Sequence, residues 1–363
     1  MSLEDKIRKV EPYVAGEQPK VPGLIKLNTN ECPYPPSGKV KEALRLLEEE
    51  SEKLRLYPDM NAQELVDAIA AHYGVDPERV FAGVGSDDVL SMCFLTFFTG
   101  GEEILFPDVT YSFYEVWAGL YRIPYRLVPL CSDFTIDPED YIPADKGGRA
   151  PGTIGGIIFP NPNAPTGIEL GQEDIERIVS ANPDCVVIVD EAYVDFGARS
   201  ALSLTEKYDN LLVVQTFSKS RAMAGSRIGF AIGSPGLIGY LKDVKFSFNS
   251  YTLNLQAIRA GRAAVEDDEY FREITGKVMQ TREWFAKELK NLGFEMTQSR
   301  TNFLFAKPLF MDTNELFLRL RENKVLVRHW DRPRIGDYLR ITIGTDDDMR
   351  EVINIIRRIK GED

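Results

Sequence analysis

Seven short apolar runs, separated by stretches of helical periodicity, constrain the fold of this chain more than any other feature of its sequence. The runs occupy residues 80–85, 102–107, 125–130, 155–160, 185–191, 211–217 and 228–233. Nearly continuous apolar runs bounded by glycine and proline are typical of parallel strands that are buried on both faces of a sheet. We therefore predict an α/β fold in which a large domain contains a mainly parallel sheet covered by helices on both faces.

The last hundred residues follow a different pattern. Residues 267–293 have the spacing of a long amphipathic helix, and shorter strands and helices alternate after it. We expect them to form a smaller α+β domain together with the N-terminal segment. The predicted division assigns residues 1–54 to an N-terminal arm and helix that pack with the small domain, residues 55–255 to the large domain, and residues 256–363 to the long linking helix and the small C-terminal domain.

The charge balance and the sparse cysteines narrow the class of protein. With 56 acidic and 43 basic residues the formal net charge is −13, a sign that repels nucleic-acid phosphates and anionic lipids. We therefore expect neither a nucleic-acid nor a membrane partner. The four cysteines are scattered without paired spacing, which favours a reducing, cytoplasmic location. With only His72 and His329 available, we expect no metal site and no Ser-His-Asp triad.

Unusual polar groups follow three of the predicted strands. Asp190 ends one apolar run, Lys219 lies just beyond another, and a Gly85-Ser86-Asp87 turn opens a helix after a third. Parallel sheets place functional groups just beyond the carboxyl ends of their strands, so we expect these groups to lie close together. Each also has an ordinary structural interpretation, because an aspartate often caps a helix and a lone lysine is usually solvated. The glycine turn resembles half of a dinucleotide-binding motif but lacks the third glycine.

Together these groups match the requirements of pyridoxal phosphate. A lysine amine must condense with the aldehyde of the cofactor, which needs a pKa below the free value of about 10.4. A carboxylate must pair with the pyridine nitrogen so that the ring can take up electrons. The phosphate needs backbone N–H groups at a helix start, hydroxyl groups and an arginine. These roles can be filled by Lys219, Asp190, the turn at residues 85–87, Ser218 and Arg227.

Three motifs carry a resemblance to a known family. They are NPNAPTG at residues 161–167, DEAY at residues 190–193, and TFSKSRAMAGSR at residues 216–227, in which the last arginine follows the lysine by eight positions. The chain resembles the fold-type I aminotransferases, and among them it is most similar to the histidinol-phosphate aminotransferase family. Segments such as LNTNECPYPPS, GVGSDDVL and YLRITIGT extend the similarity over nearly the whole chain in the expected order.

The resemblance implies a role for each residue of the cofactor site. Lys219 would bond covalently to the cofactor and carry a proton between substrate and cofactor. Asp190 would pair with the pyridine nitrogen, Tyr193 would hydrogen-bond the ring oxygen, and Tyr111 would stack on the ring. The phosphate would be held by Ser86 and Asp87 through their amides, and by Thr216, Ser218 and Arg227.

The resemblance also implies substrate contacts and a partner subunit. Arg340 would clamp the substrate α-carboxylate with Asn302 beside it, a bidentate task suited to arginine. Arg328 matches the position that meets the distal phosphate of the substrate, although an arginine that ends an edge strand can equally be a surface residue. Tyr13 is a further candidate for the same phosphate. Tyr57 would reach the phosphate of the neighbouring subunit's cofactor, which implies a homodimer with shared active sites.

The chain departs from the family pattern directly before the PTG sequence. The family usually has an asparagine there, and its amide bonds the ring oxygen of the cofactor, whereas this chain has Ala164. Asn163 could supply the contact if the loop is shifted, and we include it among the expected cofactor residues. Otherwise Tyr193 would make a larger contribution to keeping the cofactor in its reactive form.

The function that the resemblance implies is that of a cytoplasmic homodimeric enzyme, which exchanges the amino group of histidinol phosphate with 2-oxoglutarate in histidine biosynthesis. Alternatives with the same cofactor chemistry are an aromatic amino acid aminotransferase and a decarboxylase of a phosphorylated amino acid. A dinucleotide-dependent oxidoreductase would rest on the GVGSD turn alone. A non-catalytic binding protein would be expected to lack Lys219 or Asp190, and both are present.

Overall fold

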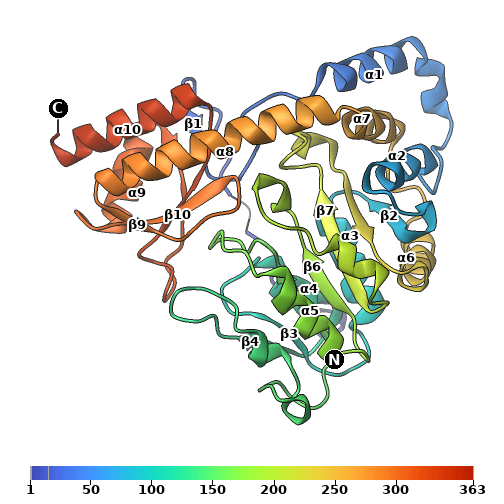
Figure 1. Cartoon of the computed structure of the whole chain (residues 1–363). Helices are drawn as coiled ribbons and strands as arrows, with labels where there is room; N and C mark the ends of the chain where they lie inside the picture. The colour runs from blue at the N-terminus through green and yellow to red at the C-terminus, as the bar shows by residue number, and fades with distance from the viewer. Residues whose placement is uncertain (1, 15, 363) are drawn as a thin grey trace.

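A computed structural model of the chain, which describes residues 2–14 and 16–362, contains a large and a small sheet (Figure 1). The strands of the large sheet are β2 (Val80–Gly83), β3 (Ile104–Pro107), β4 (Tyr125–Val128), β5 (Gly156–Pro160), β6 (Val187–Asp190), β7 (Leu211–Thr216) and β8 (Gly229–Ile232). Their order is β2-β8-β7-β6-β5-β3-β4, and only β8 runs antiparallel to its neighbours. The predicted mainly parallel sheet is confirmed, with a strand in each of the seven apolar runs.

Helices cover both faces of this sheet because the side chains of each strand alternate between the faces. On one face, α3, α4 and α6 pack against residues such as Phe106 and Leu212. On the other, α5 packs against Val187 and Val213, and α2 and α7 pack around Ile232. The bounds of these helices are α2 (Gln63–Tyr73), α3 (Ser86–Phe97), α4 (Phe113–Tyr121), α5 (Gln172–Ala181), α6 (Pro235–Phe248) and α7 (Leu255–Val265).

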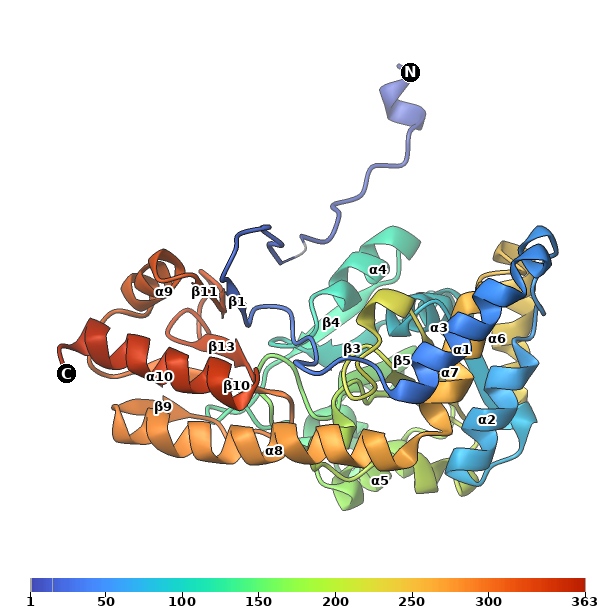
Figure 2. The ribbon, with the colours of Figure 1, turned by 90° about the horizontal axis from the view of Figure 1, so that it is seen from above.

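The small domain is an antiparallel sheet with helices packed on it. Its strands have the order β12-β13-β10-β9, and a separate parallel pair joins β1 to β11. The long helix α8 runs from the large domain along the small one, as Figure 2 shows. The bounds are β1 (Ile25–Lys26), β9 (Phe294–Met296), β10 (Phe303–Pro308), β11 (Val325–Leu326), β12 (Arg328–His329), β13 (Leu339–Thr342), α8 (Asp268–Asn291), α9 (Thr313–Glu322) and α10 (Asp346–Lys360).

The structure corrects two parts of the predicted division of the chain. Helix α1 (Gly38–Glu49) packs against α7 and the large domain, because Val40 joins the apolar cluster around Ile232, and only the segment around β1 lies with the small domain. The predicted boundary at residue 256 falls inside α7, which also packs on the large sheet. Both helices are amphipathic, and the sequence pattern alone does not say which apolar surface each one covers.

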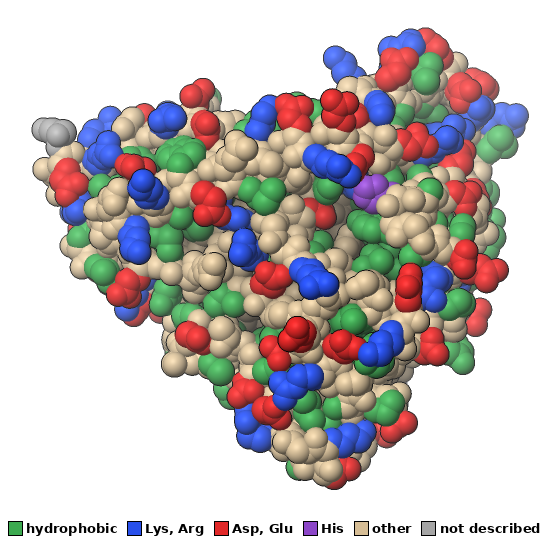
Figure 3. All heavy atoms as spheres, viewed as in Figure 1, with side chains coloured by type: hydrophobic (Ala, Val, Ile, Leu, Met, Phe, Trp, Pro, Cys, Tyr) green, Lys and Arg blue, Asp and Glu red, His purple; other side chains and the backbone are tan. Residues whose placement is uncertain are grey.

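The outer surface has a mixed charge pattern. On the face of the chain seen in Figure 3, lysine and arginine side chains are interspersed with aspartate and glutamate. Nothing on that face resembles the continuous basic surface that binds a nucleic-acid backbone. Among the helices of the described residues, none is both long and apolar enough to cross a membrane.

Candidate active site

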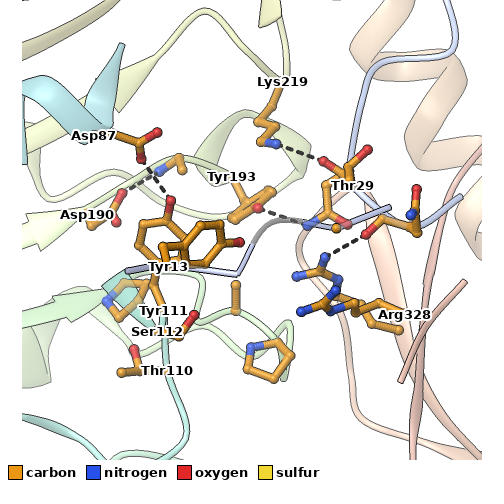
Figure 4. A pocket seen from close by; sticks show the side chains of 18 of the residues that line it. Tyr13, Thr29, Asp87, Thr110, Tyr111, Ser112, Asp190, Tyr193, Lys219 and Arg328 are labelled. Carbon is orange, nitrogen blue, oxygen red and sulfur yellow. Dashed lines mark hydrogen bonds between the residues drawn. The ribbon is translucent and has the colours of Figure 1, made fainter. Parts of the chain in front are cut away.

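A cavity of roughly 750 Å³ lies where the large domain, the small domain and the N-terminal segment meet. The ends of β6 and β7 and the start of α3 form one side, and β12, β13 and the loop between them form the other. Figure 4 shows Lys219, Asp190 and Tyr193 on the large-domain side and Arg328 on the small-domain side. The carboxyl ends of the parallel strands therefore meet at one site, as predicted from the sequence.

Lys219 projects into this cavity just beyond the end of β7. Its Nζ donates a hydrogen bond of 3.1 Å to the backbone oxygen of Thr29, and it lies 5.8 Å from the ring centre of Tyr193. The side chain is half-buried and forms no ion pair among the described residues. A primary amine held by one carbonyl group is free to exchange that contact for a bond to an aldehyde.

Asp190 forms the floor of the cavity at the end of β6. Its side chain is 4% exposed, and its Oδ2 accepts a 2.9 Å hydrogen bond from the phenol of Tyr114. The Oδ1 atom accepts a second bond, of 3.2 Å, from the backbone N–H of Ala192. Burial raises the pKa of Asp190 to about 6, although both hydrogen bonds act in the opposite direction. A cation placed beside this carboxylate would offset the cost of its burial.

A cradle for an anion forms at the start of α3. Gly85 precedes the helix with a φ of +86°, and a Cβ atom there would lie 2.5 Å from Nη2 of Arg227. A Cβ atom on Gly229 would lie 2.3 Å from the backbone nitrogen of Ser86. The two glycines thus let Arg227 and the helix N-terminus approach each other closely. A helix start beside a guanidinium group is a favourable place for a phosphate.

Hydroxyl groups complete the cradle. Nη1 of Arg227 lies 3.4 Å from Oγ of Ser218, to which Oγ1 of Thr216 also donates a hydrogen bond of 3.0 Å. Nη2 of Arg227 contacts Oδ2 of Asp87 at 3.2 Å, and Oδ1 of Asp87 accepts a 2.8 Å bond from the phenol of Tyr111. The structure thus brings together the five residues that the sequence predicted around a phosphate, with Tyr111 beside them.

Asn163 lies away from the cavity. Its amide nitrogen donates to the backbone oxygen of Val109 at 2.9 Å and to Oγ1 of Thr166 at 3.0 Å, and Ala164 lines the cavity instead. Both N–H groups of the Asn163 amide are thus occupied by Val109 and Thr166, so the structure does not support the predicted cofactor contact. Tyr193 does face the cavity, and its hydroxyl accepts a 2.8 Å hydrogen bond from Nδ2 of Asn30.

Two arginines form the small-domain side of the cavity. Arg328 and Arg340 are register partners in the β12–β13 pair, and each guanidinium group lies over the ring of Trp330, at 5.5 and 5.3 Å. Arg340 donates to the backbone oxygen of Asn28 at 3.1 Å. Burial lowers the pKa of Arg340, and the neighbouring Arg328 lowers it further. Two adjacent cations favour the binding of an anion between them.

Among the described residues, two predicted substrate residues have buried polar atoms without a partner. In the described part of the chain, Nε of Arg340 and Oδ1 of Asn302 are buried without a hydrogen-bond partner. The Asn302 amide nitrogen donates to the backbone oxygen of Asn30 at 3.0 Å, which leaves the carbonyl oxygen free. Buried polar groups are normally paired, so the unpaired Nε of Arg340 marks a position for a ligand, whereas Asn302 is not among the described residues that line the cavity.

The two remaining predicted residues have different surroundings. Tyr13 lines the cavity and stacks on Phe113 with ring centres 4.1 Å apart. Tyr57 lies outside it, is 82% exposed, and stacks on Tyr251 with ring centres 4.7 Å apart. A tyrosine so exposed has no role in the site of its own chain, and the role predicted for it involves a partner subunit.

The sequence did not reveal three residues that organise the site. Tyr114 bonds Asp190, Asn30 bonds Tyr193, and Trp330 contacts both small-domain arginines. Asn30 lies in the segment LNTNECPYPPS, Tyr114 follows Tyr111 by three positions, and Trp330 follows Arg328 by two, so each lies close to residues that the resemblance singled out. Their contacts span long sequence separations, and no local pattern indicates them.

The large sheet is mainly parallel and is covered by helices on both faces. At its carboxyl edge lie a lysine, a buried carboxylate and an anion cradle. This combination of fold and site defines a fold-type I aminotransferase. A solved structure of histidinol-phosphate aminotransferase from Sinorhizobium meliloti, in complex with pyridoxal-5'-phosphate, has this fold, with a TM-score of 0.81 and 23% identity over 93% of this chain and 91% of that one. The family model for aminotransferase class I and II matches residues 22–356.

The chain belongs to the aminotransferase class I and II family and, within it, to the histidinol-phosphate aminotransferases. It is 52% identical to histidinol-phosphate aminotransferase 1 of Bordetella parapertussis, over 96% of both chains. It is 47% identical to the histidinol-phosphate aminotransferase of Lactococcus lactis subsp. cremoris, over 98% of this chain and 97% of that protein. The family that the sequence motifs indicated is thereby confirmed.

Proposed function

We propose that this protein is a pyridoxal-phosphate-dependent enzyme that transfers the amino group of histidinol phosphate to 2-oxoglutarate, a step of histidine biosynthesis. The observation that carries the proposal is the position of Lys219, whose Nζ lies in one cavity with the buried Asp190 carboxylate and the anion cradle of Arg227. The names of the relatives at 47–52% identity support the choice of substrate.

The cavity fits the cofactor in three respects. Pyridoxal phosphate supplies an aldehyde that takes up an amino group and a protonated ring that accepts electrons. Among the described residues the Asp190 carboxylate forms no ion pair, and the ring nitrogen would provide a cation in direct contact with it. The start of α3, with Arg227 and Ser218, would hold the phosphate, and Tyr193 would donate to the ring oxygen.

Lys219 would also act as the acid and base of the reaction. Its Nζ would take the proton from the donor carbon that bears the amino group and would then deliver that proton to the cofactor. The cavity has no histidine on its walls that could compete for this task, and His329 is engaged with the backbone oxygen of Gly336 at 2.8 Å. The half-buried position of Lys219 limits access of water to that proton.

The small-domain arginines would bind both substrates in turn. The donor carries a phosphate and the acceptor carries carboxylates, so an arginine pair that binds anions can serve both half-reactions. Arg340 would clamp the acceptor's α-carboxylate through its unpaired Nε, and Arg328 would meet the donor phosphate. Tyr13 would close this end of the cavity from the N-terminal segment.

A homodimer with shared sites is part of the proposal. Figure 2 shows the N-terminal segment extending away from the body of the chain, and Leu3, Ile7 and Val14 on it are more than half exposed. Tyr57 and Phe248 form a second exposed group, at 82% and 68%. Exposed apolar surface of this kind is usually covered by another subunit in an assembly. The proposed dimer would bring Tyr57 to the cofactor phosphate of the partner subunit. The scattered free cysteines support a cytoplasmic location.

Reconstitution with pyridoxal phosphate tests the proposal. The purified protein should turn yellow, and borohydride reduction followed by peptide mass spectrometry should place the cofactor on Lys219. With histidinol phosphate and 2-oxoglutarate it should form glutamate with a higher kcat/KM than with phenylalanine as donor. A preference for phenylalanine would indicate the aromatic aminotransferase, and release of carbon dioxide from a phosphorylated amino acid would indicate the decarboxylase. A protein that binds no cofactor would overturn the proposal.

A further inference from the structure

Arg334 joins the small domain to the large one at the mouth of the cavity. Its Nη1 donates to Oδ2 of Asp108 at 2.8 Å, and its Nη2 donates to the backbone oxygens of Leu130 and Cys131 at 2.8 and 2.7 Å. Its guanidinium group also lies 5.4 Å from the ring centre of Phe134. These four partners all belong to the segments that follow β3 and β4, at least 200 positions earlier in the chain.

The backbone of Arg334 and the side chain of its acceptor Asp108 are both held in position for this contact. Arg334 has a φ of +68°, a left-handed conformation that is unfavourable for a residue with a side chain and persists only where its surroundings hold it. Asp108 is fixed as well, because its Oδ1 accepts a 2.9 Å bond from the backbone N–H of Leu130. The planar guanidinium group presents its N–H donors in a fixed fork that reaches a carboxylate and two carbonyl groups together, a geometry that the compact ammonium group of a lysine does not reproduce.

Apolar packing continues the contact on both sides of Arg334. The neighbouring Ile335 is 6% exposed and packs with Val109, Leu130 and Phe134 of the large domain. Trp330, at the other end of the same loop, packs against this cluster. The loop of residues 330–335 is thus docked on the large domain at Arg334 and Ile335.

Trp330 connects this docked loop to the substrate end of the cavity. Its ring lies 5.5 Å from the guanidinium carbon of Arg328 and 5.3 Å from that of Arg340. Both arginines line the cavity, and so do Trp330 and Arg334. Arginine stacked on a tryptophan ring is held in a restricted set of positions.

We infer that Arg334 is a positioning residue for anionic substrates: by docking the 330–335 loop on Asp108, it sets Trp330 and, through it, Arg328 and Arg340. The inference rests on the proposed function, since it concerns how that site selects a phosphorylated donor. We assign Arg334 no direct contact with the phosphate, because Asp108 and two backbone oxygens hold three of its N–H groups, including both on Nη2. Its effect would therefore appear in the recognition of the anionic group and not in the cofactor.

Kinetics of the holoenzyme with two donors tests this role. In Arg334→Ala we expect the KM for histidinol phosphate to rise about tenfold or more with a smaller change in kcat, because a displaced anion site weakens binding before it affects the reacting atoms. For histidinol, which lacks the phosphate, kcat/KM should change less than about threefold. The visible absorbance of the cofactor and its pH dependence should match those of the wild type.

Further variants separate positioning from general damage. Arg334→Lys should recover little of the loss, and Asp108→Asn should reproduce it. The double variant Asp108→Asn with Arg334→Ala should be no worse than either single one, because both remove the same contact. Arg300→Ala is the matched control: it also removes an arginine that pairs across the two domains, with Glu169 at 3.9 Å, but outside the cavity. It should leave both donors unaffected.

Two results would overturn the inference. One is an equal loss for histidinol phosphate and histidinol in Arg334→Ala, and the other is an altered cofactor absorbance in that variant. Failure of the proposed function has a different signature, because the wild type itself would then show no preference for the phosphorylated donor or no cofactor absorbance.

Discussion

Arg328 and Arg340 lie side by side as register partners of β12 and β13, with the ring of Trp330 against both guanidinium groups. Two cations in this arrangement repel each other unless an anion lies between them. The pair therefore provides the attraction for an anionic group at the small-domain end of the cavity. The effect of removing one member should depend on the charge of the substrate.

Replacement of Arg328 by alanine should affect a phosphorylated donor most. We expect kcat/KM for histidinol phosphate to fall about 100-fold, the loss of a charge-assisted contact worth about 2–3 kcal/mol, and kcat/KM for phenylalanine to fall much less. Steady-state kinetics with both donors measures this difference. Arg319→Ala, on the exposed side of α9, should change neither value. Equal losses for the two donors would mean that Arg328 does not bind the phosphate.

Asp190 and Tyr114 should have separable effects on activity. Asp190→Asn removes the charge that would hold the ring nitrogen protonated, and we expect kcat/KM to fall at least about 1000-fold, while the cofactor still binds. Tyr114→Phe keeps the carboxylate but removes a hydrogen bond that lowers its pKa, so the pKa should rise further and kcat/KM should fall about tenfold. A loss of kcat/KM in Tyr114→Phe as large as the loss in Asp190→Asn would contradict this prediction.

Gly85→Ala should weaken cofactor binding. The added methyl group would lie 2.5 Å from Nη2 of Arg227 and would displace it from the phosphate cradle, so we expect the dissociation constant of the cofactor to rise about tenfold or more. An absorbance titration of the apoprotein measures it. Gly74→Ala is the control, because Gly74 also has a positive φ, of +69°, but open space around its Cβ position. It should cost about 1 kcal/mol of stability without changing cofactor affinity.

Complementation between two inactive variants tests the shared site of the proposed homodimer. Lys219→Ala and Tyr57→Ala damage different residues of one site, and these residues would come from different protomers. Dissociation and reassociation of a mixture should restore roughly a quarter of the wild-type activity, because about half of the dimers are mixed and each has one intact site. A mixture of Lys219→Ala and Arg227→Ala should regain none, since both residues lie in the same protomer's site.

Glu191 should make the stability of the apoprotein depend on pH. It is 1% exposed, accepts hydrogen bonds from Ser200, Ala201 and Gln215, and burial raises its pKa from 4.5 to about 7. The folded state therefore binds more protons than the unfolded state in this window, so the free energy of unfolding falls as the pH rises through it. The fall attributable to Glu191 should be about 2 kcal/mol between pH 5 and 7.

Urea unfolding of the apoprotein at fixed protein concentration measures that dependence. Glu191→Gln should lack this part of the pH dependence, whatever its absolute stability, because glutamine does not titrate. Glu173→Gln, at an exposed position of α5, should keep the slope of the wild type. A wild-type stability that rises between pH 5 and 7 would contradict the assignment.

Much of the site could be predicted from the sequence, because its residues directly follow buried strands. Lys219 comes directly after β7 and Asp190 ends β6, so apolar runs locate them and the parallel arrangement brings them together. Asn163 shows where this reasoning stops. Asn163, the neighbour of Ala164 in the sequence, was expected to replace the missing asparagine, but its amide is held by Val109 and Thr166.

Periodicity and the spacing of residues within short segments were enough to predict the strands, most of the helices, and the lysine, aspartate and arginine of the cofactor site. Other features emerge only from the folded chain: β8 enters the sheet antiparallel, α1 packs on α7, and Tyr114, Asn30 and Arg334 hold the site together. Each of these depends on contacts between residues far apart in the chain. Such contacts form only when whole elements have packed, and no local pattern of residues encodes them.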